Sequence, residues 1–248
     1  MSSITLSNKT ALVTGGSRGI GAGIAKRLAK EGANVVITYA QSSDLAQGVV
    51  DEIRAGGGNA QAIRADSALA DEAVGAVTTA VELFGGLDIL VNNAGVAALD
   101  PLDVATHEEI QRMIDINVRA VILTTREALR YLPSGGRIIN IGSVNADRMP
   151  LPGGSPYSMT KGAVAGFTRG LARELAPKNI TVNNVQPGPV DTDLNPMTGP
   201  WADNMLAHLA EPRFGTVEEI ASLVAYLAGP EATFMTGSSV TIDGGFGA

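Results

Sequence analysis

A tyrosine and a lysine, Tyr157 and Lys161, stand four residues apart in the segment SPYSMTKGAVAGF. Because Pro156 suits the first turn of a helix, we expect both side chains to project from one helical face about one turn apart. A tyrosine whose pKa is about 10 is a poor proton donor or acceptor at neutral pH until a nearby cation lowers that pKa. Lys161 can supply this charge, so the pair predicts acid–base catalysis by a phenol.

Other polar residues follow predicted strands or lie in predicted helices nearby in the sequence. Ser143 comes directly after the predicted strand 137–142, Asn117 lies inside a long predicted helix, and the segment 92–95 (NNAG) ends another strand. Parallel α/β sheets place their sites at the carboxyl ends of strands. Taken singly, Ser143 can be a turn hydroxyl and Asn117 a buried polar group. Together with the pair above they form the candidate catalytic set Asn117, Ser143, Tyr157 and Lys161.

The segment 14–21 (TGGSRGIG) follows the first predicted strand and begins the first predicted helix. Glycines there allow a tight turn and close backbone approach, and the free N–H groups of a helix N-terminus favour an anion. This position in the first strand–helix turn predicts a loop that binds the pyrophosphate of a dinucleotide. The predicted cofactor-binding residues in the loop are Gly15, Ser17, Arg18, Gly19, Ile20 and Gly21.

The end of the second predicted strand bears on which dinucleotide binds. An NAD-binding site of this architecture usually has Asp or Glu there, which accepts hydrogen bonds from the adenosine ribose. The segment 38–43 (TYAQSS) contains no acid, and the first acid is Asp44. Arg18 can pair with a 2′-phosphate, although it can also be a solvated loop arginine. We therefore expect NADP(H) in preference to NAD(H), with contacts from Tyr39, Ala40 and Ser42.

Short β-branched runs recur along the chain and must position these residues. Most are apolar throughout, as expected for strands that are buried on both faces. The predicted strands are 10–14, 34–38, 60–64, 88–92, 137–142, 180–186 and 239–242. Helical patterns separate them: Ile20, Ile24 and Leu28 recur at steps of four within 19–31. Alternation of strands and helices from end to end predicts a single α/β domain, residues 1–248, with one doubly wound seven-stranded parallel sheet and helices on both faces.

Capping boxes mark the start of two further helices. Thr106 with Glu109 begins the long helix that contains Asn117, and Thr216 with Glu219 begins a helix near residue 220. The proline-rich segment about 188–215 breaks the alternation and carries apolar residues that include Trp201. A connection this long is usually a binding loop, so we expect it to be a substrate-binding lid; an inert surface insertion is the alternative.

Composition excludes several classes of protein. The 248 residues contain no cysteine and two histidines, which argues against a disulfide framework, thiolate-based metal sites and a Ser-His-Asp triad; no metal is expected. A net charge of −7 without a basic cluster argues against nucleic acid or an anionic membrane as a partner. The polar N-terminal residues and the absence of a long apolar run lead us to expect a cytoplasmic protein.

In its motifs the chain resembles the short-chain dehydrogenase/reductase family over essentially its whole length. The matching motifs, in the family's order, are Thr14-Gly-x-x-x-Gly19-x-Gly21, Asn92-Asn-Ala-Gly95, Asn117, Ser143, Tyr157-x-x-x-Lys161 and Pro187-Gly188. The resemblance implies a Rossmann fold, reversible hydride transfer between NAD(P)(H) and a carbonyl or alcohol carbon, and a homotetramer.

The resemblance also implies roles for individual residues. Tyr157 would protonate the ketone oxygen, Ser143 would hydrogen-bond it, Lys161 would lower the pKa of Tyr157 and bind the nicotinamide ribose, and Asn117 would hold a water that relays protons. Further cofactor contacts implied in this way are Asp66, Ser67, Asn93, Ala94, Gly95, Tyr157, Lys161, Pro187, Gly188, Val190 and Thr192.

The substrate is left open among three readings. We favour an NADPH-dependent carbonyl reductase that converts a small or medium ketone to a secondary alcohol, with Trp201 and apolar lid residues as the substrate wall. A 3-oxoacyl-[acyl-carrier-protein] reductase of fatty acid synthesis is the first alternative, for which Arg126, Arg130, Arg169 and Arg173 could bind the acidic carrier. A non-catalytic nucleotide-sensing protein is a remote alternative, because it would not need the catalytic set.

Overall fold

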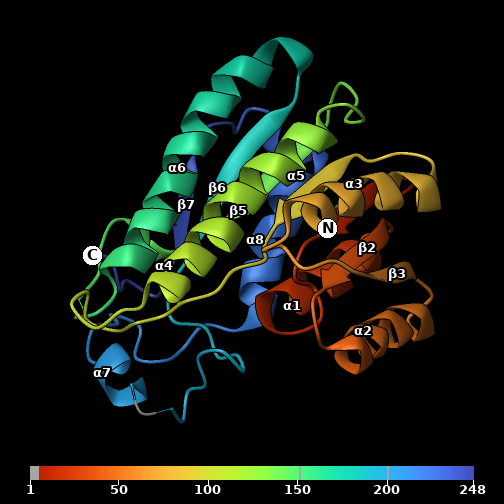
Figure 1. Ribbon diagram of the computed structural model, residues 1–248. Coiled ribbons are helices and arrows are strands. Elements are labelled where there is room, and N and C mark those ends of the chain that lie inside the picture. Colours follow the sequence, from red (N-terminus) through yellow and green to blue (C-terminus); the bar gives the residue numbers. More distant parts are fainter. Residues whose placement is uncertain (1–5, 151, 200) are drawn as a thin grey trace.

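The computed structural model describes residues 6–150, 152–199 and 201–248. Its centre is one parallel sheet in the strand order β3-β2-β1-β4-β5-β6-β7 (Figure 1). The strands are β1 (Thr10–Val13), β2 (Asn34–Tyr39), β3 (Asn59–Arg64), β4 (Ile89–Asn92), β5 (Arg137–Ile141), β6 (Thr181–Pro187) and β7 (Ser239–Ile242). Each predicted strand is present, and its ends differ from the prediction by at most one residue. The predicted fold class, a Rossmann-type sheet in a single domain, is confirmed.

Helices cover both faces of the sheet (Figure 1). The α-helices are α1 (Gly19–Lys30), α2 (Ser43–Ala55), α3 (Ala70–Phe84), α4 (His107–Ile114), α5 (Ala120–Ala128), α6 (Ser155–Leu175), α7 (Ala202–Leu206) and α8 (Val217–Ala228), of which α7 lies apart from the sheet. Alternate residues of a strand point to opposite faces. Thus Val13 packs in a cluster with Ile24 of α1 and Val224 of α8, whereas its neighbour Leu12 packs with Leu171 of α6.

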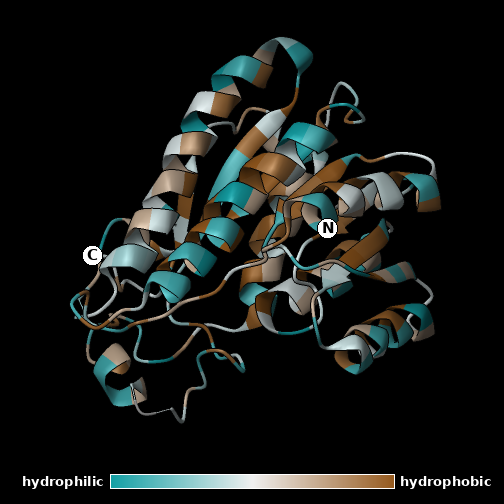
Figure 2. Ribbon diagram, in the orientation of Figure 1, coloured by the Kyte–Doolittle hydropathy of each residue, from teal (hydrophilic) through white to brown (hydrophobic). Residues whose placement is uncertain are grey.

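Burial on both faces explains why most of the strands are rich in apolar residues. Every residue of β1, β4, β5 and β6 is buried. Brown, the colour of hydrophobic residues, recurs along the strands in Figure 2, whereas β6 also carries the buried polar residues Asn183, Asn184 and Gln186. Polar residues concentrate on the outer sides of the surrounding helices. Within the described ranges, no helix combines the length and hydropathy needed to cross a membrane.

The long helix predicted from Thr106 is interrupted. Its capping box is present, since the Thr106 side chain accepts a hydrogen bond from Glu109 N at 3.2 Å. Between α4 and α5, however, residues Asp115–Arg119 form a π-helical turn that contains Asn117. The inserted residue of such a turn cannot be read from apolar spacing, and π turns occur frequently at functional sites.

The segment that follows β6 is not a simple loop but has structure of its own. A parallel bridge pairs Val190 with Gly215 at its two ends, and it contains the short helix α7, which the sequence pattern did not predict. Leu209 and Phe214 are buried in a cluster with Phe246, from beyond β7. Figure 1 shows α7 set apart from the layered body at one end of the molecule.

Candidate active site

A cleft of about 520 Å³ lies where β1, β4, β5 and β6 end. Parallel α/β sheets form such a crevice because loops leave their strands in different directions at the point where strand order reverses. Here β1 pairs with β2 on one side and with β4 on the other, so the order of the strands in the sheet reverses between β1 and β4. All twenty residues predicted to bind the cofactor line this cleft, and so does Ser143.

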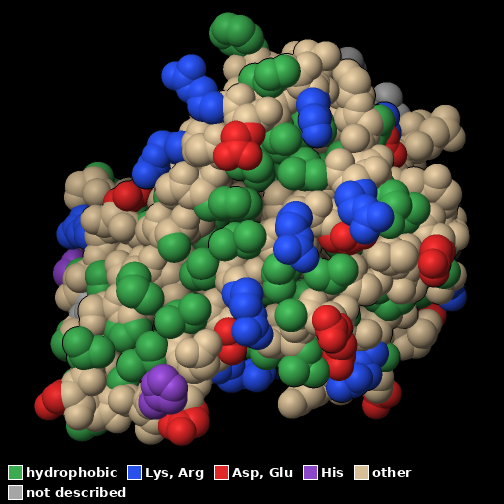
Figure 3. Space-filling view, turned by 45° about the horizontal axis from the view of Figure 1, so that its top comes forward, with side chains coloured by type: hydrophobic (Ala, Val, Ile, Leu, Met, Phe, Trp, Pro, Cys, Tyr) green, Lys and Arg blue, Asp and Glu red, His purple; other side chains and the backbone are tan. Residues whose placement is uncertain are grey.

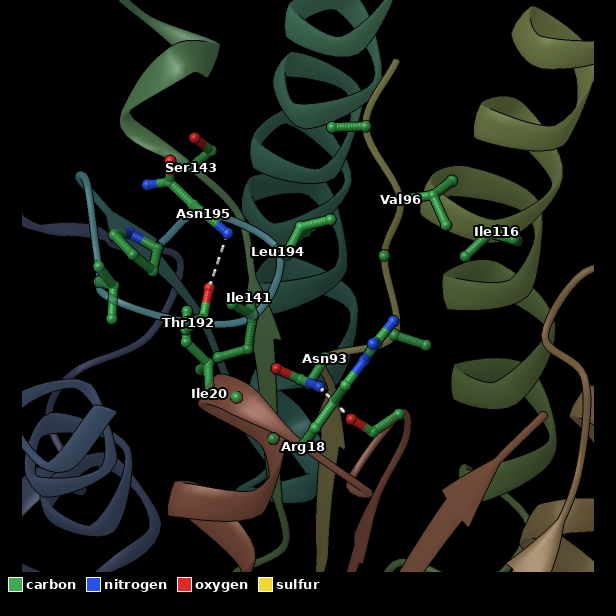
Figure 4. Close-up of a pocket in the computed structure, with 18 of the residues that line it drawn as sticks. Arg18, Ile20, Asn93, Val96, Ile116, Ile141, Ser143, Thr192, Leu194 and Asn195 are labelled. Atoms are coloured by element: carbon green, nitrogen blue, oxygen red, sulfur yellow. Dashed lines mark hydrogen bonds between the residues drawn. The ribbon is translucent and has the colours of Figure 1, made fainter. Parts of the chain in front are cut away.

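The glycine loop is held against the end of β4. The side-chain amide nitrogen of Asn93 donates hydrogen bonds to the carbonyl oxygens of Thr14 and Gly15, both at 2.9 Å (Figure 4). In return, Thr14 Oγ1 accepts hydrogen bonds from the backbone of Asn93 and Ala94 at 3.0 Å. These contacts fix the loop so that the N-terminus of α1 opens into the cleft.

Two glycines of the loop are required by its geometry. Gly15 has a φ of +63°, and a Cβ there would approach Ala94 Cα to 2.9 Å. A Cβ on Gly21 would collide with Gly15 O and with the side chain of Asn93. A hydrogen at these positions leaves the backbone exposed to a ligand, and this is the cradle that a pyrophosphate needs.

Polar groups without an aspartate or glutamate lie where β2 ends. Tyr39, Ala40 and Ser42 line this part of the cleft, and Arg18, whose extended side chain is drawn in Figure 4, lines the cleft as well. Asp66, at the end of β3, accepts a hydrogen bond from Ala68 N at 2.9 Å. Its carboxylate is therefore engaged within its own turn. This arrangement is suited to a 2′-phosphate that pairs with a guanidinium.

At the other end of the cleft, Lys161 and Tyr157 share one face of α6, as predicted. Lys161 Nζ lies 5.7 Å from the centre of the Tyr157 ring and donates a hydrogen bond to Ile141 O at 3.0 Å. Burial lowers the pKa of Lys161 to about 8. Its ammonium is thus partly deprotonated slightly above neutral pH, which is unusual for lysine.

The pKa of Tyr157 differs from the expectation. Burial raises this pKa above its ordinary value, and a hydrogen bond with Ser143 acts in the opposite direction. The sequence predicted a lowering by Lys161. The protein environment instead disfavours the phenolate. The free energy needed to remove its charge from water is larger than the stabilisation that the phenolate gains from a single hydrogen bond. Tyr157 is consequently held as a neutral phenol that can donate a proton.

Asn117 is buried behind the cleft. Its Oδ1 accepts a hydrogen bond from Val96 N at 2.9 Å, and its Nδ2 donates to Val96 O at 2.8 Å and to Thr160 Oγ1 at 3.1 Å. A Cβ built on Gly95 would lie 3.5 Å from both Asn117 Oδ1 and Lys161 Nζ. The two polar atoms therefore border one small space next to Gly95, which is compatible with a bridging water.

Several lining residues were not predicted, and two expected residues, Asn117 and Trp201, do not line the cleft. Trp201 is 53% exposed and is not among the lining residues, so it is not the substrate wall in this structure, whereas the lid residues Leu194 and Met205 do line the cleft. The unpredicted lining side chains at the catalytic end include Leu99, Val144, Met149 and Phe246. No local pattern marks them, because folding brings them together from distant segments.

Comparison with known proteins agrees with this geometry. A sequence profile described as enoyl-(acyl carrier protein) reductase matches residues 15–247. A protein of Escherichia coli described as a cyclic-di-GMP-binding biofilm dispersal mediator is 48% identical, over 97% of this chain and 98% of its own length. A 3-oxoacyl-[acyl-carrier-protein] reductase of Synechocystis is 42% identical, over 97% of each chain.

A solved structure is also similar. A short-chain dehydrogenase of Burkholderia cenocepacia, crystallised in complex with NADP, is 50% identical and superposes with a TM-score of 0.97. The match covers 98% of this chain and 99% of that one.

Proposed function

Because the chain belongs to the short-chain dehydrogenase/reductase family of oxidoreductases, we propose that it is an NADPH-dependent carbonyl reductase that converts a ketone to a secondary alcohol. The observation that carries this proposal is the meeting of Ser143, Tyr157 and Lys161 in the same cleft as the glycine loop. A hydride donor bound along the loop would bring its reacting carbon toward these three groups.

The cleft fits a dinucleotide phosphate. The glycine cradle would hold the pyrophosphate, Arg18 would hold the 2′-phosphate, and Asp66 and Ser67 would flank the adenine. Pro187, Gly188, Val190 and Thr192 lie at the catalytic end, where they would hold the nicotinamide. NADPH supplies the hydride when it is bound, and the similar Burkholderia structure contains NADP.

The residues of this chain would handle the substrate oxygen and its proton. Ser143 and Tyr157 both line the cleft, and Ser143 is close enough to act on the pKa of Tyr157, so a ketone oxygen placed between the two hydroxyls would accept a hydrogen bond from each. Tyr157, held neutral by its environment, donates the proton as the oxygen gains charge. The ammonium of Lys161 stabilises the phenolate that remains, and Asn117 and Lys161 would hold the water that returns a proton.

Turnover with a panel of carbonyl compounds tests this proposal. Purified protein is mixed with NADPH and, in separate reactions, with ketones, keto esters, sugars and an acetoacetyl thioester, while NADPH absorbance is followed. We expect NADPH consumption with at least one ketone and formation of the corresponding alcohol. Absence of consumption with every compound, despite tight NADPH binding, contradicts the proposal and favours a nucleotide-sensing role.

Reduction of a 3-oxoacyl group carried by an acyl carrier protein is the second candidate. Four arginines are exposed on or next to α5 and α6: Arg126 on α5, Arg130 in the turn that follows α5, and Arg169 and Arg173 on α6. They would attract an acidic carrier despite the net charge of −7, and the Synechocystis relative is named for this reaction. If a carrier-bound substrate reacts faster than the free thioester, and Arg173→Ala removes the difference, this candidate replaces the first.

The association of subunits is also a proposal. Ile122 of α5 and Met159 of α6 are exposed, and a Cβ on Gly162 would meet no described atom within 4 Å. In Figure 3, whose view brings the upper end of α6 forward, hydrophobic side chains gather in the middle of the face. This surface suits close packing against a second copy, as expected for a homotetramer. The lid role of 188–215 and the cytoplasmic location stay predictions.

A further inference from the structure

The segment that follows β7 returns to the catalytic end of the cleft. The Asp243 carboxylate accepts hydrogen bonds from Gly245 N at 3.0 Å and Gly247 N at 2.7 Å. Gly245 has a φ of +78°, which a residue with a side chain rarely adopts. These features fold 243–247 into a compact turn and give it one defined shape.

The turn contacts the lid segment 188–215 at two places. A Cβ on Gly188 would come within 2.6 Å of Asp243, and a Cβ on Gly245 within 2.6 Å of Ala210. Glu211 N donates a hydrogen bond to Gly244 O at 2.9 Å. The turn thus contacts the lid segment both where it begins, at Gly188, and near its end, at Ala210 and Glu211.

Phe246 occupies the centre of this contact. It is 3% exposed although it lies on a surface segment, and it lines the cleft. It belongs to a buried cluster with Ala202, Leu209 and Phe214 of the lid and Val144, the residue after Ser143. His208 packs edge-on against its ring, with centroids 5.9 Å apart.

Arg148 secures this position from the loop that follows β5. Its Nη1 donates hydrogen bonds to Phe246 O at 2.7 Å and to the main-chain oxygen of Ala248 at 2.6 Å. The loop also carries Asn145, whose carbonyl oxygen accepts a hydrogen bond from Ser158 of α6. Phe246 is therefore fixed relative to both Ser143 and Tyr157, the residues that would hold the ketone oxygen.

We propose that Phe246, anchored by Arg148, is the wall that sets the size of the substituent accepted beside the ketone carbonyl. This inference rests on the proposed reductase function. The aromatic ring of Phe246 supports the apolar residues of the lid and borders the space next to Ser143. A wall that is itself packed and tethered cannot swing away for a larger substrate, so it discriminates by size.

Substrate ratios for Phe246→Ala test the proposal. Initial rates are measured with acetone and acetophenone at saturating NADPH. We expect the kcat/KM ratio of acetophenone to acetone to rise at least about tenfold, as removal of an apolar wall changes discrimination by one to two powers of ten. The Kd of NADPH should change less than about twofold, because Phe246 lies away from the glycine loop. Arg148→Met should shift the ratio in the same direction, by less.

Two further variants separate the wall from general damage. Phe234→Ala makes the same change at a fully exposed phenylalanine outside the cleft and should leave the ratio unchanged. Phe246→Leu retains most of the apolar packing and should give a smaller shift in the same direction if Phe246→Ala does not fold. An unchanged ratio in an active Phe246→Ala or Phe246→Leu enzyme overturns the proposal.

Hydrogen exchange distinguishes failure of this inference from failure of the reductase function. Amides in residues 202–214 should exchange faster in Phe246→Ala than in the wild type, whereas amides in α1 should not change. If the wild type reduces no ketone, the proposed function fails. If, in addition, exchange in 202–214 is the same in Phe246→Ala and in the wild type, the packing on which this inference depends is overturned as well.

Discussion

Asn117 and Thr160 belong to different helices and are joined by a hydrogen bond of 3.1 Å between Nδ2 and Oγ1. Thr160 in turn donates to Tyr157 O at 2.7 Å, within α6. The π turn that carries Asn117 is thereby tied to the turn of α6 that carries Tyr157 and Lys161. Both polar side chains are almost completely buried, so this tie is not exchanged with solvent.

Replacing Thr160 with valine keeps the side-chain shape and removes this tie. One amide hydrogen of Asn117 is then left without its acceptor, and we expect the free energy of unfolding to fall by about 1–3 kcal/mol. Urea denaturation measures the loss. Thr78→Val, at a helical threonine on α3 outside the site, is the matched control. A change of less than about 0.5 kcal/mol would show that the Asn117 amide finds another partner.

Tyr157→Phe removes the proposed proton donor and leaves the ring. We expect kcat for ketone reduction to fall at least about a hundredfold, since general acid–base catalysis contributes about 10²–10⁴. NADPH affinity, followed by cofactor fluorescence, should stay close to that of the wild type. Tyr131→Phe is the control, because that hydroxyl contacts Glu127 at 3.3 Å and does not line the cleft. Turnover above a hundredth of the wild-type rate would exclude Tyr157 as the acid.

Lys161 should make the reaction sensitive to pH near 8. Its pKa is lowered to about 8, so the side chain is charged below this pH and loses its charge as the pH rises through it. The kcat/KM for NADPH, which reports groups of the free enzyme, should be level below about pH 8 and decline above it. The pKa of Tyr157 is raised and does not account for such a decline.

Lys161→Arg is the informative variant for this profile, because arginine stays charged throughout the range. Its activity can be low, but the decline near pH 8 should be absent. A decline that persists in Lys161→Arg would assign the titration to another group.

Arg18→Ala should weaken NADPH binding much more than NADH binding. A guanidinium pairs with the 2′-phosphate, which NADH lacks, and a charge-assisted contact of this kind contributes about 1.5–3 kcal/mol, or roughly tenfold to a hundredfold in Kd. Titration of both cofactors by fluorescence measures the two changes. Arg173→Ala, at an exposed position outside the cleft, should alter neither. Equal losses for NADPH and NADH, or tighter wild-type binding of NADH, would refute the role given to Arg18.

Gly166→Glu tests whether α6 packs against a second copy. Gly166 is exposed on α6, and a Cβ there would meet Arg169 Nη2 at 4.0 Å. Glycine disfavours a helix interior by about 1 kcal/mol relative to alanine, so the substitution should not unfold a single chain. A charged side chain should nevertheless prevent close helix packing and lower the molecular mass measured by light scattering. An unchanged mass would place any interface elsewhere.

The amino-acid sequence determined the architecture and most of the cleft. Strands that are buried on both faces are rich in apolar residues, loops need glycine where φ is positive, and capping boxes mark helix starts. These signals are local, and the strand segments, Gly15 and Thr106 show them in the sequence. Because parallel strands deliver their carboxyl ends to one edge, residues as distant as Gly15 and Tyr157 could be assigned to a single site from the sequence alone.

Tertiary structure decided the features that depend on contacts between distant segments. The π turn at Asn117 is compatible with the same helical pattern as an unbroken helix, and hydrogen bonds to Val96 and Thr160 accompany it. The direction of the Tyr157 pKa depends on how much protein surrounds the phenol. Phe246 reaches the cleft, and Trp201 does not, because long-range packing and not local propensity determines which apolar side chains of the lid region are buried.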